Sequence, residues 1–148
     1  MKDFTIYKDT VYQVIGAALR VYNTQGHGLL EPIYNESLSL ELMDSGIANE
    51  AECEVDCYYK HHKLKKKYRV DVLVGEDICL ELKSVQTILP EHRCQLFNYL
   101  RLTRIPVGIL INFGGKSLKG ERYGYDIETN TCYRLDKNMQ PLHKENWR

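Results

Sequence analysis

The sequence has no excess of charge, no long apolar run and no closely spaced pair of cysteines. Lys and Arg together number 20, as do Asp and Glu, so nucleic-acid binding would need a local basic patch. Residues 1–13 lack the apolar core of a signal peptide, and no segment approaches the roughly 18 apolar residues of a membrane helix. We therefore expect a soluble, cytoplasmic protein without membrane contacts.

The cysteines are odd in number and form no CxxC motif, which argues against a disulfide framework or a zinc site. The five cysteines include no CxxC pair. Cys53 and Cys57 lie in an alternating segment, where both would face one side of a strand as packed, reduced thiols. A chain of 148 residues without a repeat or linker predicts one domain over residues 1–148.

Apolar residues at helical spacing predict two helices in the first third of the chain. Asp9 or Thr10 caps the first helix. The second helix has Pro32 in its first turn and runs to Asp44. The apolar face of the first consists of Val11, Val14, Ile15, Ala18, Leu19 and Tyr22, and that of the second includes Tyr34, Leu38 and Leu42.

From residue 51 the apolar period changes to two, which is typical of half-buried strands. We expect strands over residues 51–59, 68–74 and 78–83, with the basic segment 60–69 turning the chain between the first two. The alternation places Asp71 on the strand face opposite its neighbouring valines. The first two strands therefore form a hairpin.

The second half of the chain predicts a crossover between parallel strands. Pro90 opens a third helix over residues 91–102, and residues 105–113 are almost continuously apolar, as in a central strand covered on both faces. A helix between two strands implies a right-handed crossover. The remaining elements are a closing hairpin of residues 123–126 and 132–135 and a loosely held polar tail, residues 141–148.

Charged residues interrupt two of the predicted strands. Glu81 and Lys83 share a strand face because they lie two residues apart, and pairing with the preceding strand would bring Asp71 to the same side. Each residue alone is more often part of a solvated face than of a catalytic site. Together, two adjacent carboxylates need a cation such as Mg²⁺, with Mn²⁺ as the alternative ion. A metal beside a lysine suits phosphodiester hydrolysis.

A basic run follows the first predicted strand. Its candidate phosphate-binding residues are Lys63, Lys65, Lys66, Lys67 and Arg69. Such a run is often only a solvated turn, but beside a metal site it favours phosphate binding.

The third predicted helix carries Gln95 and Tyr99 one turn apart, on a face offset from its apolar stripe of Leu96 and Leu100. His92 lies one turn before Gln95, but a lone helix histidine is usually a surface residue, and we leave it out of the site.

Four segments together resemble a known family. They are residues 28–34, which read GxxExxY, residues 69–74, the Glu81-Leu82-Lys83 strand and residues 95–99. In this order they resemble the GxxExxY family of PD-(D/E)xK nucleases over residues 11–114. The resemblance implies a restriction-endonuclease-like α/β fold with an αβββαβ core. Its mixed sheet would be flanked by helices and followed by the C-terminal β-hairpin.

The resemblance also implies roles for individual residues. Glu31, Asp71 and Glu81 would be the metal ligands, and Lys83 the catalytic lysine. Gln95 and Tyr99 would help to hold the active site and the nucleic-acid strand. For Glu31 an alternative exists, because the helix dipole favours an acid in the first turn without any catalytic purpose.

Two classes of function remain open from the sequence. The first is a metal-dependent nuclease that hydrolyses nucleic-acid phosphodiester bonds, expected to be those of DNA, in repair or defence. The second is a catalytically inactive nucleic-acid-binding or protein-interaction module on the same fold. The intact set of Asp71, Glu81 and Lys83 favours the enzyme. A homodimer or larger assembly is compatible with either class.

Overall fold

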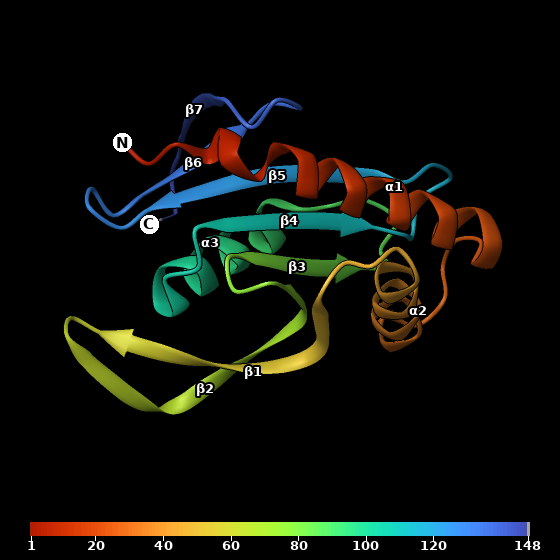
Figure 1. Cartoon of the computed structure of the whole chain (residues 1–148). Coiled ribbons are helices and arrows are strands. Elements are labelled where there is room, and N and C mark those ends of the chain that lie inside the picture. Colours follow the sequence, from red (N-terminus) through yellow and green to blue (C-terminus); the bar gives the residue numbers. More distant parts are fainter. Residues whose placement is uncertain (148) are drawn as a thin grey trace.

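A seven-stranded mixed sheet, with helices on both faces, organises the computed structural model, which describes residues 1–147 (Figure 1). The strands lie side by side in sequence order. Only β3 and β4 are parallel, and α3 makes the crossover between them. The elements are η1 (Phe4–Tyr7), α1 (Lys8–Gln25), α2 (Glu31–Asp44), β1 (Asn49–Tyr59), β2 (His62–Val74), β3 (Ile78–Lys83), α3 (Pro90–Thr103), β4 (Val107–Asn112), β5 (Lys119–Asp126), β6 (Thr131–Leu135) and β7 (Pro141–Glu145).

This element order confirms the predicted α/β fold. The succession α2, β1, β2, β3, α3, β4 is the αβββαβ core, and β5 and β6 form the C-terminal hairpin. One hydrophobic core lies between the sheet and the pair α1 and α2, and a second lies between the sheet and α3. Every residue of β4 is buried, as predicted for a central strand.

Helix α1 buries a narrower face than its sequence suggests. Its fully buried residues are Val11, Val14, Ala17, Ala18 and Val21. Leu19, which we expected inside, is 45% exposed. The prediction was wrong because the buried stripe follows the positions around Val14 and Ala18, and Leu19 lies beyond its edge. The helix therefore carries a second, solvent-facing apolar stripe.

The basic segment belongs to β2 rather than to a turn. Strand β2 begins at His62, and the chain reverses at Lys60 and His61, with Lys60 at a positive φ of 52°. Cross-strand pairs continue through this region, including Asp56 with Lys67 and Tyr59 with His62. Most of the predicted basic turn is therefore part of an exposed strand. Backbone hydrogen bonds and charge pairs with β1 extend the hairpin through this segment.

The C-terminal tail is also ordered. Residues 141–145, expected to be loose, form β7 along the open edge of β6, where their backbone groups find partners. All five cysteines are free, and Cys57, Cys79 and Cys132 are buried. Within residues 1–147, no helix is both long enough and apolar enough to cross a membrane.

The turn before β7 contributes Met139 to the main core. This side chain is fully buried, whereas Met43 on α2 is 60% exposed. We expect Met139→Ala to lower the free energy of unfolding by about 2–5 kcal/mol, because it leaves a cavity. The matched control Met43→Ala should change it by no more than about 0.5 kcal/mol. Urea denaturation compares the two, and equal midpoints would show that the C-terminal segment adds nothing to the core.

Candidate active site

The site forms where β2 separates from β3. The two strands pair only from Val72 to Val74. Beyond this point the Oδ2 atom of Asp71 accepts the backbone N–H of Leu82 at 2.8 Å, which replaces the missing ladder bond. The side-chain amide of Asn35 on α2 approaches Oδ1 at 3.5 Å. Asp71 is thereby held at the point where the strands diverge.

The alternation of β2 is broken at Asp71. Val72 packs in the core under α1 and α2, but Val70 packs in the core under α3. In a regular strand both valines would share one face. The predicted simple alternation over residues 68–74 was therefore wrong at this position. The irregularity lets the Asp71 carboxylate reach the backbone of β3 instead of pointing straight out of the sheet.

Glu81 lies in the middle of the site and is only 6% exposed. Burial first, and the adjacent Asp71 carboxyl second, raise the pKa of Glu81 well above its ordinary value. The hydroxyl of Tyr68 donates to Oε2 at 2.7 Å, and this bond and the charge of Lys83 act in the opposite direction by favouring the charged form. A proton on Glu81 or a nearby cation would relieve the remaining penalty.

A chain of side-chain contacts connects Lys83 to Glu81 through α3. The ammonium group of Lys83 donates to Oε1 of Gln95 at 3.5 Å, and Nε2 of Gln95 donates to the hydroxyl of Tyr99 at 2.6 Å. The Tyr99 ring stacks on that of Tyr68, with centroids 3.6 Å apart. The structure thus brings together the strand residues and the helix residues that the sequence singled out.

Tyr68 is the site residue that sequence reasoning missed. Its place in the alternating strand is that of a core residue, and the only signal was its hydroxyl, which a buried tyrosine has to pair. Burial and the Glu81 carboxyl raise the pKa of Tyr68 far above its usual range. The hydroxyl therefore stays protonated and acts as a permanent donor to Glu81.

Glu31 reaches the site from a different direction. It is the first residue of α2, and its Oε2 accepts the backbone N–H of Ser84 at 3.3 Å, directly after Lys83. Among residues 1–147, no three His, Cys, Asp or Glu side chains are grouped as a metal site. Asp71 and Glu81 are adjacent, whereas Glu31 lies at the end of β3 with its own backbone partner.

The paired carboxyls nevertheless suit a hard divalent ion. Magnesium binds oxygen ligands and commonly uses only one or two carboxylates, with water filling the other positions. The Asp71 and Glu81 carboxyls are oxygen donors whose mutual repulsion in a buried setting an ion would relieve. The donor set fits such an ion without a third protein ligand.

The segment that follows Lys83 is fixed by Asn112 at the end of β4. Its Oδ1 accepts the backbone N–H groups of Val85 at 3.1 Å and Gly114 at 2.9 Å, and its Nδ2 donates to the Val85 carbonyl at 2.9 Å. A Cβ at Gly114 would lie 2.2 Å from the Val85 oxygen, so only glycine fits. The exit from β3 therefore has a defined path.

The basic residues of β2 differ in their pairing. Lys63 and Lys67 both contact Asp56, at 3.2 and 3.7 Å, and Arg69 contacts Glu52 at 3.8 Å. Lys65 and Lys66 are exposed, and no ion pair engages them within the described chain. The strand that carries these cations continues directly to Asp71.

Comparison with known proteins places this geometry in a family. Residues 8–123 match the PD-(D/E)XK nuclease superfamily, and the chain belongs to it. This match confirms the predicted resemblance at the superfamily level. The matched span contains Glu31, Asp71, Glu81, Lys83, Gln95 and Tyr99. Members typically use divalent metal ions, and the family suggests nuclease activity.

A solved structure shows the same fold. The crystal structure of SSO0001 is similar to this chain with a TM-score of 0.51 and 24% sequence identity. The match covers 66% of this chain and 52% of SSO0001, so this chain spans about half the length of that protein. No curated protein matches the sequence significantly.

An ion pair fastens α3 to β5 and so supports Gln95 and Tyr99. The guanidinium of Arg93 donates to both carboxylate oxygens of Glu121, at 2.8 and 2.9 Å. Burial alone would raise the pKa of Glu121, but hydrogen bonds from Arg93 and Tyr123 lower it below the ordinary value. A lowered folded-state pKa stabilises the protein above the unfolded-state pKa, and this contribution is lost as the pH falls through the folded-state pKa.

We expect Glu121→Gln to lower the free energy of unfolding at pH 7 by about 1–2 kcal/mol, since partial solvent screening limits the loss. The deficit should shrink as the pH falls from the ordinary glutamate pKa of about 4.3 through the lowered pKa of Glu121, because the carboxyl then becomes protonated in the unaltered protein too. Urea denaturation at several pH values measures the difference in the free energy of unfolding between the variant and the unaltered protein. The exposed Glu76→Gln is the matched control and should show no deficit at any pH. A deficit for Glu121→Gln that persists unchanged in acid would contradict the ionic contribution.

Proposed function

We propose that the protein is a magnesium-dependent nuclease of the GxxExxY type that hydrolyses the phosphodiester bonds of DNA. The observation that carries this proposal is the buried Glu81 carboxyl beside the half-buried carboxyl of Asp71, with Lys83 two residues further along the strand of Glu81. Such a pair is costly for folding alone, because a buried carboxylate then lies next to a second negative charge. Membership in the nuclease superfamily supports the same activity.

In the proposed mechanism, Asp71 and Glu81 would hold Mg²⁺, or Mn²⁺ in its place. A bound ion of this kind would supply a lowered pKa for its water and positive charge to offset that of the phosphate. Lys83 stabilises the negative charge that develops on the phosphate during attack. Gln95 orients Lys83 through its side-chain oxygen, and Tyr68 orients Glu81 through its hydroxyl.

Two further groups complete the proposed site. Glu31 lies beside the end of β3, where its carboxylate accepts the Ser84 amide, and it would add a further oxygen ligand for the ion. Tyr99 braces Tyr68 by stacking and receives the amide of Gln95. The exposed cations of β2 would attract the nucleic-acid backbone towards this strand.

The decisive test compares two substitutions at the site. Glu81→Gln removes a negative ligand, so both cleavage and metal affinity should fall. Lys83→Ala spares the carboxyls, so cleavage should fall by about 100-fold to 1000-fold while metal affinity persists. Labelled DNA measures cleavage with Mg²⁺ or Mn²⁺, and titration calorimetry measures metal affinity.

Glu76→Gln is the matched control, because Glu76 is exposed in the turn between β2 and β3. It should leave both cleavage and metal affinity unchanged. If the unaltered protein binds DNA but cleaves neither DNA nor RNA with either metal, the inactive binding module replaces the nuclease.

The cations of β2 give a separate prediction for binding. We expect Lys65→Gln with Lys66→Gln to weaken DNA binding and to reduce the slope of log affinity against log salt by about 1 per lysine. Neutralising Lys63 and Lys67 should have a smaller effect, because both already contact Asp56. Fluorescence anisotropy in chelator, where no cleavage occurs, measures both pairs. If all variants and the unaltered protein gave equal slopes, the basic hairpin would be a solvated surface without a role in DNA binding.

A further inference from the structure

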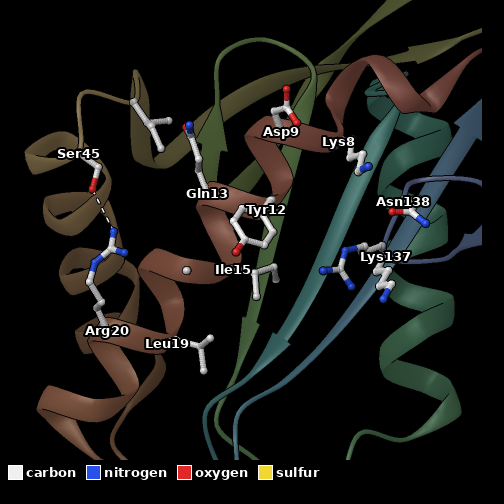
Figure 2. Close-up of a pocket in the computed structure, with 13 residues that line it drawn as sticks. Lys8, Asp9, Tyr12, Gln13, Ile15, Leu19, Arg20, Ser45, Lys137 and Asn138 are labelled. Atoms are coloured by element: carbon white, nitrogen blue, oxygen red, sulfur yellow. Dashed lines mark hydrogen bonds between the residues drawn. The ribbon is translucent and has the colours of Figure 1, made fainter.

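A groove of about 910 Å³ crosses the outer side of α1 (Figure 2). Helix α1 covers the sheet face opposite α3, which carries Gln95 and Tyr99 (Figure 1). The groove is bordered by the end of α2 at Ser45 and by the turn between β6 and β7 at Lys137. No residue of the candidate active site lines it.

The floor of the groove is apolar. Tyr12, Ile15 and Leu19 recur at helical spacing along α1 and line the groove. Tyr12 is 77% exposed and Leu19 is 45% exposed, whereas Ile15 is half-buried and packs against the core at the base of the groove. Figure 2 shows their side chains along one side of α1, between Arg20 and Lys137. Such a contiguous exposed stripe is typical of an interaction surface.

Gly16 keeps the groove open where it passes over the helix. A glycine in the interior of a helix is destabilising relative to alanine. Its φ is not positive, and an added Cβ would meet only the Arg20 guanidinium at an ordinary contact distance of 3.6 Å. The fold therefore does not require a glycine here. What the missing side chain provides is open space between the two sides of the groove.

The rim of the groove is basic and partly unpaired. Arg20 is already engaged by Glu41 at 3.5 Å and by Ser45 at 3.0 Å. By contrast, no salt bridge engages Lys8, Arg122 or Lys137 within residues 1–147. Asp9 is the one acidic residue among those that line the groove. The free cations therefore lie at the end of the groove near the start of α1 and the turn after β6.

Arg122 is the strongest anion-seeking group of this rim. It lies on β5 opposite Ile109, whose side chain belongs to the core beneath α1. Its Nε is buried and has no hydrogen-bond partner, and burial, followed by Arg134, lowers the pKa of the guanidinium. The nearby Asp136 uses its carboxylate to accept the backbone N–H groups of Asn138 and Gln140. The Nε atom itself is enclosed, so an acceptor from outside the chain would pair with the part of the guanidinium that lines the groove.

We propose that this groove binds an acidic amphipathic helix of a partner protein. Apolar side chains of that helix would cover Tyr12, Ile15 and Leu19, and its carboxylates would pair with the free cations of the rim. An apolar floor favours a peptide over a nucleic-acid backbone, which would need a continuous row of cations. This function goes beyond nuclease activity, because no residue of the candidate active site lines the groove.

The first test uses synthetic peptides with the full chain. A fluorescein-labelled helical peptide with leucine on one face and glutamate on the other should bind saturably, with a Kd below about 1 mM. The same peptide with glutamine or lysine in place of glutamate should bind at least about tenfold more weakly. If the Leu/Glu peptide shows no saturable binding, or if the three peptides bind equally, the proposal is wrong.

The second test changes the groove. Gly16→Met places the side chain of a strong helix former in the open space of the groove. The Tm of the protein should therefore stay the same or rise, and its affinity for the Leu/Glu peptide should fall by about tenfold or more. Arg122→Gln with Lys137→Gln should also weaken it, whereas the exposed Lys144→Gln, outside the groove, should not. Cleavage by the Gly16→Met variant should be unchanged, which separates this proposal from the nuclease.

A contrary result would be peptide affinity unaltered by Gly16→Met in a variant that is folded by circular dichroism. A second contrary result would combine two observations. The Leu/Glu peptide would fail to bind the unaltered protein, and the substitutions at Arg122 and Lys137 would lower the affinity of the protein for a DNA duplex. The groove would then be a nucleic-acid surface instead of a peptide site.

Discussion

The candidate site depends on one constraint, which is that the buried carboxyl of Glu81 lies beside the half-buried carboxyl of Asp71 where two strands part. Burial and the neighbouring carboxyl both penalise the charge of Glu81, so the pair needs hydrogen-bond donors, a proton or a cation. The chain supplies neutral donors, namely the Leu82 amide to Asp71 and the Tyr68 hydroxyl to Glu81. These orient the carboxyls without adding positive charge. The positive charge that balances the carboxylates comes from Lys83 and, in the proposed mechanism, from a divalent ion.

That constraint explains the irregularity of β2. The strand gives up its ladder with β3 beyond Val72, and Val70 and Val72 enter different cores. The Asp71 carboxylate then accepts the amide that a strand partner would otherwise have bonded. A regular strand would have satisfied the backbone but kept Asp71 away from the backbone of β3. Strand pairing is therefore lost at the position where the chemistry is proposed to occur.

The sequence predicted the elements whose pattern is local. Strand β3 has the predicted bounds, Ile78–Lys83, because its alternation is complete and a turn precedes it. The residues that were missed depend on partners distant in sequence. Strand β7 forms because β6 offers an open edge, and Leu19 is exposed because other positions of α1 meet the sheet. Tyr68 joins the site only because the alternation breaks at Asp71, which periodicity alone does not reveal.

The candidate active site and the groove on α1 share no residue, and the connection between α1 and α2 explains why the two need not interfere. The hydroxyl of Tyr34 donates to the Gly26 carbonyl at 2.7 Å and accepts the Leu29 amide at 3.1 Å, and its ring stacks on Phe113. The turn that leads to Glu31 is thus fastened to the core at both ends. A partner bound to α1 would contact a helix whose connection to α2, and so to Glu31, is held in a single conformation by the contacts of Tyr34. Docking there would therefore add a binding function without moving the carboxyls of the site.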